Sequence, residues 1–458
     1  MLSKYNLKAV VFDDVEAEAK PLIDALNDER IPNIFINFNT DENEDKKIKN
    51  IRLVFADLIL GTTVAGDLSA LIEPIFRSID NNISDDNGPF ILVVWSKHSD
   101  HAEALKDKLE SSSNLNFKMI ELDKTSYMHQ HEGVYQLIDP DAFNRLKGDI
   151  SDKLNSLEYI KIFLEWEKDA RDSISKILNN FLENIDDRDK VKETVSSTIK
   201  TTLGENRTIE IQDKINAFYR TLNTVLADSI ENNSEPLTEH EEFLNDLDFE
   251  NINDNMKAEI NRKTLFEDPV NNEIKTGNIY SFNDFKNLFY GDVIKDVCGC
   301  DYENILELDL FRYKKACKFF EQEPTETPDD FQKRHLQKMK ETSYPILLEF
   351  TPSCDIAQKK YTKSRLIFGY IINSKHACLK NESESLYITR FHFQYKDEQR
   401  GLDGNYRLAF FIKNIFAVNP EKIKKLTPMI RARKEFATDL QHAIANHISR
   451  IGVSSLDL

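Results

Sequence analysis

Five short apolar runs in the first 125 residues limit the fold of this 458-residue chain more than any other feature. We expect them to be strands, and they comprise residues 7–14, 33–38, 51–58, 89–96 and 117–124. Most of them lack the polar alternation of a half-buried strand. Segments with helical periodicity lie between them, at residues 16–30, 67–82 and 101–112. Such alternation predicts an open, doubly wound α/β domain with a parallel sheet covered on both faces.

Polar side chains stand at the carboxyl ends of four of these runs. They are Asp13 and Asp14 after the first run, Asp57 after the third, Ser96 after the fourth and Lys124 after the fifth. The carboxyl ends of parallel strands meet at the edge of the sheet where ligands bind. We therefore expect these groups to converge in one crevice, although they lie up to 111 positions apart. A lone buried carboxylate is costly, and a role in this crevice accounts for Asp57 in the run "VFADLIL".

The chemistry of this set points to a metal ion and a phosphoryl group. Two or three carboxylates in one crevice repel one another unless a cation joins them. Mg²⁺ prefers a few carboxylate oxygens with water and phosphate, so Asp13, Asp14 and Asp57 form a candidate Mg²⁺ site. Ser96 and Lys124 supply the hydroxyl and the cation that hold a phosphoryl oxygen. Asp57 is then the expected nucleophile, which forms an acyl phosphate.

The same residues resemble the receiver domain of bacterial two-component response regulators. That domain has paired acids after the first strand, a phosphoacceptor aspartate in a "DLxL" context after the third, Ser or Thr after the fourth and Lys after the fifth. The matching residues are Asp13 and Asp14, Asp57 in "DLIL", Ser96 and Lys124, within residues 5–145. The resemblance implies that a sensor histidine kinase phosphorylates Asp57 and that Ser96 and Lys124 contact the phosphoryl group.

The resemblance also implies a set of Mg²⁺ ligands. Asp14, Asp57 and the backbone carbonyl of Ile59 would bind the ion directly, and Asp13 would act nearby or through water. The sequence departs from the receiver pattern in three places. The interval from Asp57 to Ser96 is longer than usual, Thr125 replaces the customary proline, and no aromatic residue stands just before Lys124. The usual aromatic switch is therefore less well supported than the phosphoacceptor.

The rest of the chain predicts two further domains. Residues 1–145 form the receiver-like domain, 146–268 a helical region with an acidic linker, and 269–458 a β-rich α+β domain that ends in a basic helix. Expected strands in the last domain are residues 344–358, 364–373, 385–393 and 406–418, and the expected closing helix is 429–452. This layout resembles receiver proteins without an evident effector enzyme, including those of Detocs-type phage-defence systems.

That layout implies a relay or a phosphate sink in antiviral defence. The expected partners are a sensor histidine kinase and another receiver-containing effector. No enzymatic activity is expected beyond the receiver's own phosphorylation and dephosphorylation. Two alternatives stay open: a receiver-controlled effector enzyme whose activity lies in the C-terminal domain, and a docking scaffold that is not phosphorylated.

The effector alternative depends on the segment "TPSCDIAQKK". Cys354 would be its nucleophile, His376 or His392 its base, and Asp355 the residue that orients the base. Turn and capping chemistry explains the same segment without catalysis.

Other patterns carry less weight. A zinc site could draw on Cys298, Cys300, Cys317 and Cys354, but the spacing is not that of a zinc knuckle. His129 and His131 could bind a metal, although an exposed loop is the simpler interpretation, and His240 is expected on a solvated helix face. The closing helix is expected to carry the basic residues Lys422, Lys424, Lys425, Arg431, Arg433, Lys434 and Arg450.

Charge and composition exclude several classes of function. The net charge of −19 opposes general binding to nucleic acid or anionic lipid. No window approaches the length of a membrane span. The beginning "MLSKYNLKAVVFDD" is typical of a first strand and not of a signal peptide. We expect a cytoplasmic protein whose five cysteines are reduced.

Overall fold

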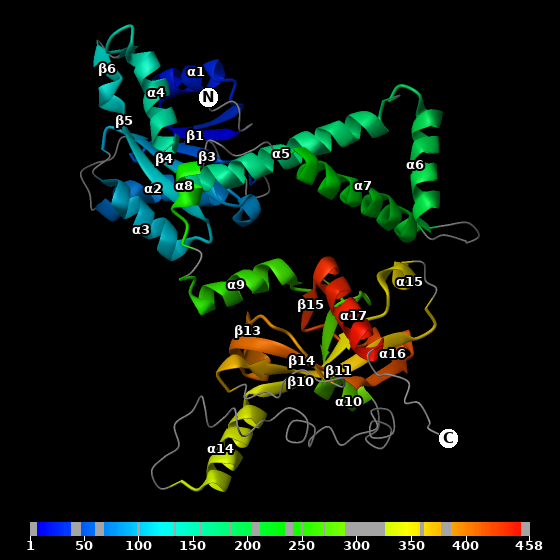
Figure 1. The fold of residues 1–458 in the computed structure, drawn as a ribbon. Helices are drawn as coiled ribbons and strands as arrows, with labels where there is room; N and C mark the ends of the chain where they lie inside the picture. The colour runs from blue at the N-terminus through cyan, green and yellow to red at the C-terminus, as the bar shows by residue number, and fades with distance from the viewer. Residues whose placement is uncertain are drawn as a thin grey trace, which may run out of the picture. The chain divides into compact units, whose positions relative to one another are not determined.

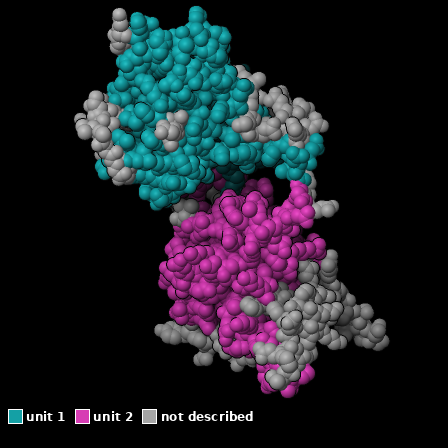
Figure 2. Space-filling model, turned by 90° about the vertical axis from the view of Figure 1, so that its left-hand side faces the viewer, with its two compact units in different colours: residues 1–194, 220–247 teal, residues 195–219, 248–458 magenta. Residues whose placement is uncertain are grey.

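The computed structural model describes residues 7–37, 47–59, 68–98, 101–131, 134–155, 157–183, 185–203, 211–233, 241–248, 251–269, 271–288, 326–357, 361–376 and 386–449. The chain divides into two compact units, which Figure 2 colours separately. Unit 1 comprises residues 1–194 and 220–247, and unit 2 comprises residues 195–219 and 248–458. The division into three domains stays a prediction. Within the described ranges, no helix is long and apolar enough to cross a membrane.

Unit 1 contains a five-stranded parallel sheet in the order β2-β1-β3-β4-β5 (Figure 1). The strands are β1 (Ala9–Asp13), β2 (Asn33–Asn37), β3 (Leu53–Ala56), β4 (Phe90–Ser96) and β5 (Phe117–Asp123). Each strand lies within one of the predicted runs, and every pairing between neighbours is parallel. The predicted parallel sheet is confirmed.

Helices cover both faces of this sheet. Helices α1 (Glu16–Asp28) and α4 (Ala142–Asn155) pack on one face, and α2 (Leu68–Asn82) and α3 (Ala102–Ser112) pack on the other. Val11 of β1 belongs to the first core and its neighbour Val10 to the second, and both are fully buried. Because both faces of the sheet are buried, apolar residues are favoured at every position of the strand, which explains the absence of polar alternation. Burial of each valine side chain stabilises the fold by about 1.5–3 kcal/mol.

A short hairpin follows β5 and was not predicted. Its strands β6 (Met128–His131) and β7 (Val134–Leu137) pair antiparallel. His129 and His131 lie on β6 with exposed side chains. The prediction of a loop at these histidines was therefore wrong, while their exposure was predicted correctly.

The predicted helical region is present. After α4 it contains α5 (Glu158–Phe181), α6 (Arg188–Leu203), α7 (Ile211–Asn233), α8 (Glu241–Asn245) and α9 (Asp254–Leu265). Helix α5 is tied to the sheet of unit 1 by a two-point ion pair. Arg52 beside β3 donates to the two carboxylate oxygens of Glu167 at 2.7 and 3.0 Å.

Unit 2 is built on an antiparallel sheet, as the β-rich prediction required. Its described strands are β8 (Phe266–Glu267), β9 (Asn278–Ser281), β10 (Ser343–Glu349), β11 (Ser364–Asn373), β12 (Leu386–Ile388), β13 (Phe393–Asp397), β14 (Leu402–Val418) and β15 (Ile430–Ala432). Their order is β12-β14-β11-β10-β9-β15-β8, with β13 also paired to β14. After α9, the α-helices described in unit 2 are α10 (Phe282–Leu288), α14 (Pro328–Glu341), α15 (Ser353–Ala357), α16 (Pro420–Ile423) and α17 (Lys434–Ser449).

Several predicted elements of unit 2 have different bounds. The expected strand 344–358 ends at Glu349, because the turn at Pro352 starts α15, and the amide of Ile356 donates to the Pro352 carbonyl at 3.1 Å. The expected strand 385–393 divides into β12 and the beginning of β13. The expected helix 429–452 begins with a strand, β15, which pairs with β9 and β8.

The predicted closing helix is present as α17, but it begins at Lys434 and not at residue 429, and of the predicted basic residues that are described only Lys434 lies on it. Lys422 lies on α16 and Arg431 on β15, while Lys424, Lys425 and Arg433 lie just outside these elements. Arg431 and Arg433 both form ion pairs with Glu267, the last residue of the neighbouring strand β8. Arg450 lies outside the described residues.

Candidate functional site

The parallel strands bring the predicted residues to one edge of unit 1. Asp13 ends β1, and Asp57 follows β3, whose Ala56 is in register with Phe12. The amide of Asp57 donates to the Phe12 carbonyl at 3.0 Å, which extends the pairing to the site. Ser96, the last residue of β4, is in register with Asp123, the last residue of β5. Lys124 therefore follows directly after the end of the sheet. The register of the sheet thus sets the positions of these side chains.

Asp57 is held through both of its carboxylate oxygens. The hydroxyl of Ser96 donates to Oδ1 at 2.7 Å, and Nζ of Lys124 donates to Oδ2 at 2.6 Å. The Ser96 oxygen in turn accepts the amide of His98 at 3.2 Å. Asp57 is 8% exposed, while Ser96 and Lys124 are fully buried. A hydroxyl and a cation therefore fix the orientation of the expected phosphoacceptor.

Lys124 is the centre of the site. Its ammonium group contacts Asp13 and Asp57 at 2.6 Å each and Glu18 at 3.3 Å. Burial opposes the charged form, but the carboxylates of Asp57 and Asp13 outweigh it and raise the pKa of Lys124 above its usual range. The lysine is therefore charged at neutral pH. Removing one partner of such a buried pair typically costs about 3–5 kcal/mol.

Asp13 is a buried acid with a displaced pKa. Burial, together with the charge of Asp57, raises its pKa to about 6, although Lys124 opposes the shift. Its Oδ1 accepts the amide of Val15 at 2.9 Å, which holds the carboxyl group at the start of α1. At neutral pH the group is ionised, and it binds a proton more readily than an exposed aspartate does.

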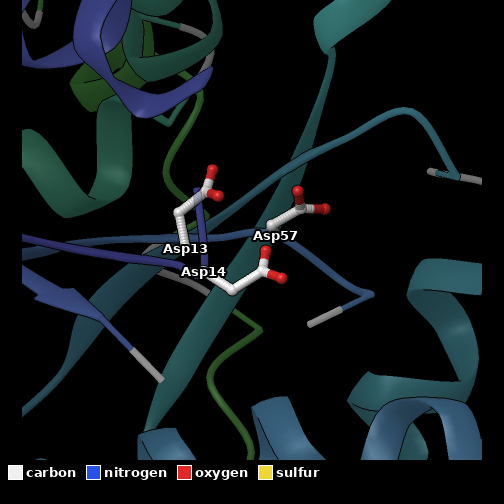
Figure 3. A group of neighbouring side chains, drawn as sticks. All are labelled: Asp13, Asp14 and Asp57. Carbon is white, nitrogen blue, oxygen red and sulfur yellow. The ribbon is translucent and has the colours of Figure 1, made fainter. Parts of the chain in front are cut away.

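The three acids are close enough to share one cation. Carboxylate oxygens of Asp13, Asp14 and Asp57 lie within 4.8 Å of one another, and Figure 3 shows the side chains gathered at the strand ends. These hard oxygen ligands fit Mg²⁺. With Glu18, Lys124 and Lys97 included, the cluster of described side chains comprises four carboxylates and two ammonium groups. A divalent cation would balance this surplus of negative charge.

Two predicted details lie near this cluster. Ile59 follows Asp57 by two residues, is half-buried and packs against the core under α2 and α3. Its role through the backbone carbonyl stays a prediction. Thr125, which stands in place of proline, donates both its amide and its hydroxyl to Asp123 at 2.8 Å. Proline could not donate that amide, so the departure from the receiver pattern stabilises the turn that holds Lys124.

Sequence reasoning missed three residues beside the site. Glu18 of α1 is 6% exposed and contacts both Lys124 and Lys97, and Lys97 also contacts Tyr135 of β7. One signal was present, because Glu18 lies on the same helical face as the buried residues Leu22 and Ala25. A charged residue in an apolar stripe indicates a buried partner. The partners themselves could not be read from α1.

The other predicted sites are not assembled by the described residues. Cys298, Cys300, Cys317 and His240 lie outside them, as do the side chains of Cys354 and His376. Asp355 lies on α15, 4.0 Å from Arg365. His392 is half-buried, and burial and the nearby Arg407 lower its pKa. The zinc site and the catalytic cysteine stay predictions.

A scan of the chain against protein-family models gave no match, and a search of curated proteins gave none either. The function of the chain is therefore inferred from the geometry of its site.

Proposed function

We propose that unit 1 is a phosphoacceptor domain of the receiver type, which accepts a phosphoryl group on Asp57 from a sensor histidine kinase. One observation carries the proposal: Ser96 and Lys124 hold the two oxygens of Asp57 at 2.7 and 2.6 Å beside a cluster of two further acids. Phosphoryl transfer to an aspartate needs a hydroxyl, a cation and a group of acids that can hold a metal ion around one carboxylate.

The residues have distinct roles in the proposed reaction. A carboxylate oxygen of Asp57 attacks phosphorus, the phosphorus–nitrogen bond to the donor histidine breaks, and the electron pair of that bond returns to the imidazole. Lys124 and Ser96 then move from the carboxylate to oxygens of the phosphoryl group. Asp13 and Asp14 would hold Mg²⁺ with Asp57, and the ion would neutralise the charge of the phosphoryl oxygens.

The electrostatics of the crevice support this assignment. The raised pKa of Lys124 keeps its cation at the place where phosphoryl charge develops. The cation is already oriented by Asp13, so little reorganisation is needed at the moment of transfer. Burial strengthens each of these interactions relative to water.

The proposed wider role is the one that the resemblance in domain layout implies. The chain acts as a relay or as a phosphate sink for its kinase, with another receiver-containing effector as the further partner and antiviral defence as the setting. No activity beyond phosphorylation and dephosphorylation of the domain is required. The catalytic site that Cys354 would provide stays the alternative.

Intact mass after incubation with Mg²⁺ and acetyl phosphate tests the proposal. Wild type is expected to gain the mass of one phosphoryl group, and Asp57→Asn is expected to gain none. The matched control is Asp107→Asn, which makes the same change at an exposed position of α3 and should be phosphorylated like wild type. If wild type gains no phosphate from acetyl phosphate or from a phosphorylated histidine kinase, the domain is a docking module.

A further inference from the structure

The third acid beside Lys124 comes from helix α1 and not from the edge of the sheet. Oε2 of Glu18 lies 3.3 Å from Nζ of Lys124, and its Oε1 lies 3.0 Å from Nζ of Lys97, the residue after Ser96. Glu18 is 6% exposed. One buried carboxylate thus contacts two lysines. Lys124 would itself contact the phosphoryl group, and Lys97 follows Ser96, which would also contact it.

The same network reaches the β6–β7 hairpin. Nζ of Lys97 donates to the hydroxyl of Tyr135 at 3.3 Å and lies 4.5 Å from the centre of its ring. Lys97 therefore contacts both the Glu18 carboxylate and the Tyr135 hydroxyl. Tyr135 belongs to β7, so a polar chain runs from Asp57 through Lys124 and Glu18 to the hairpin.

The base of the hairpin is attached to the rigid part of the domain. Tyr127, just before β6, stacks on the buried Trp95 of β4, with ring centres 5.7 Å apart. Its hydroxyl donates to Asp149 of α4 at 2.6 Å. The hairpin is therefore fixed at its base, and Tyr135 provides a second contact that depends on the state of Glu18.

Phosphorylation would add new hydrogen-bond acceptors beside the ammonium group of Lys124. A phosphoryl group brings up to about two negative charges and three strong acceptor oxygens to the position beside Asp57. Glu18 competes with those oxygens for the same ammonium group. When Lys124 turns to the phosphoryl group, Glu18 keeps its ion pair with Lys97, which also contacts Tyr135. The bonds at Tyr135 therefore differ between the two states.

We propose that Glu18 is a positioning residue that holds Lys124 before phosphorylation and, through Lys97 and Tyr135, couples the phosphorylation of Asp57 to the β6–β7 hairpin. The coupling element is the carboxylate of Glu18, which is shared between Lys124 on one side and Lys97 with Tyr135 on the other. This inference rests on the proposed function. It supplies a route to the surface that needs no aromatic residue before Lys124.

Hydrogen exchange of the full chain, with and without acetyl phosphate and Mg²⁺, tests the coupling. In wild type, phosphorylation should change amide exchange in β6 and β7 at least about threefold, the effect of one ordinary hydrogen bond. Glu18→Gln keeps the shape of the side chain and removes its charge. It should still accept phosphate, with a larger phosphorylated fraction at equal donor concentration, but the hairpin should no longer respond. Tyr135→Phe should also accept phosphate and lose the response.

The matched control is Glu16→Gln, the same change at an exposed position in the first turn of α1, which should behave like wild type. The phosphorylated fraction is measured by intact mass in the same samples. Absence of an adduct on wild type overturns the proposed function and this inference together. An adduct with an unchanged hairpin response in Glu18→Gln and Tyr135→Phe overturns the inference alone. If Glu18→Gln does not fold, Tyr135→Phe decides.

Discussion

Unit 1 and unit 2 each bury a carboxyl group completely, but different groups surround it. Asp13 in unit 1 meets the ammonium group of Lys124 at 2.6 Å. Glu349 in unit 2 accepts the amide of Thr351 at 3.1 Å and its hydroxyl at 2.5 Å, and none of the ion pairs between described residues includes it. Burial raises the pKa of both acids.

The comparison separates a structural acid from one suited to chemistry. Burial favours the protonated form of Glu349 although its hydroxyl and amide donors oppose the shift, and a protonated carboxyl group is an ordinary polar part of a core. Three acids around one buried lysine carry a high desolvation cost, and apolar residues of the same volume often give equal or greater stability. The costly arrangement is therefore the one for which a function is expected. Five predictions sharpen or break this distinction.

The largest expected effect is that of Lys124→Met, which leaves Asp13, Asp57 and Glu18 without their shared cation. Unit 1 should lose about 3–5 kcal/mol of unfolding free energy. Both tryptophans of the chain, Trp95 and Trp166, lie in unit 1, so tryptophan fluorescence during urea unfolding follows this unit. The exposed Lys118→Met is the control. Equal midpoints for the two variants would show that the pairing contributes nothing.

The pH dependence of unit 1 should have an unusual sign. Because burial raises the pKa of Asp13 from 3.8 to about 6, the native state binds more protons than the unfolded state between those values. The contribution of this group to stability is therefore present at low pH and is lost as pH rises through about 6. At 1.36 kcal/mol per pKa unit, the loss is about 3 kcal/mol relative to Asp13→Asn. The difference is measured by urea unfolding at pH 4 and 7, and parallel profiles for the two proteins would contradict it.

Glu349→Gln should change how the stability of unit 2 depends on pH. Its raised pKa means that the wild-type contribution to stability is present at acid pH and is lost as pH rises. Glutamine can accept the same hydrogen bonds from Thr351 and has no charge to bury, so the stability of the variant relative to wild type should rise between pH 4 and pH 8. Hydrogen exchange of β10 and β11 measures this change.

Addition of Mg²⁺ should stabilise unit 1 but not β10. An equal effect on both would contradict the distinction between the two buried acids.

Ser96→Ala has the smallest expected effect. It removes the 2.7 Å hydrogen bond to Oδ1 of Asp57, worth about 1 kcal/mol. The yield of phosphorylated protein from acetyl phosphate should fall severalfold, while the tryptophan-detected midpoint moves little. Ser113→Ala, which removes a hydroxyl from the far end of α3, is the control. Unchanged phosphorylation in Ser96→Ala would remove this residue from the proposed site.

The sequence predicted the sheet and the central residues of the site because these depend on local patterns. A run such as "AVVFD" is apolar on both faces, and the polar residue after it marks the strand end. Ser96 and Lys124 were predicted in the same way. The sheet order then brings Asp13 and Lys124 together across 111 positions.

The remaining features depend on partners that are distant in the chain. Strand β15 was missed because Arg431 and Arg433 look like a helix surface until Glu267, more than 160 positions away, pairs with them. The β6–β7 hairpin was missed because the polar strand "MHQH" has no apolar alternation of its own. Glu18 was missed because its lysine partners lie on loops that only the folded sheet brings to α1.

The central claim is that Asp57 is the phosphoacceptor, and mapping of the phosphorylated residue tests it most directly. Borohydride reduces an aspartyl phosphate to homoserine, which changes the mass of the peptide that contains it. After incubation of wild type with a phosphorylated histidine kinase and Mg²⁺, we expect homoserine at position 57 and nowhere else. Homoserine at another aspartate, or unmodified Asp57 in protein that has taken up phosphate, would contradict it.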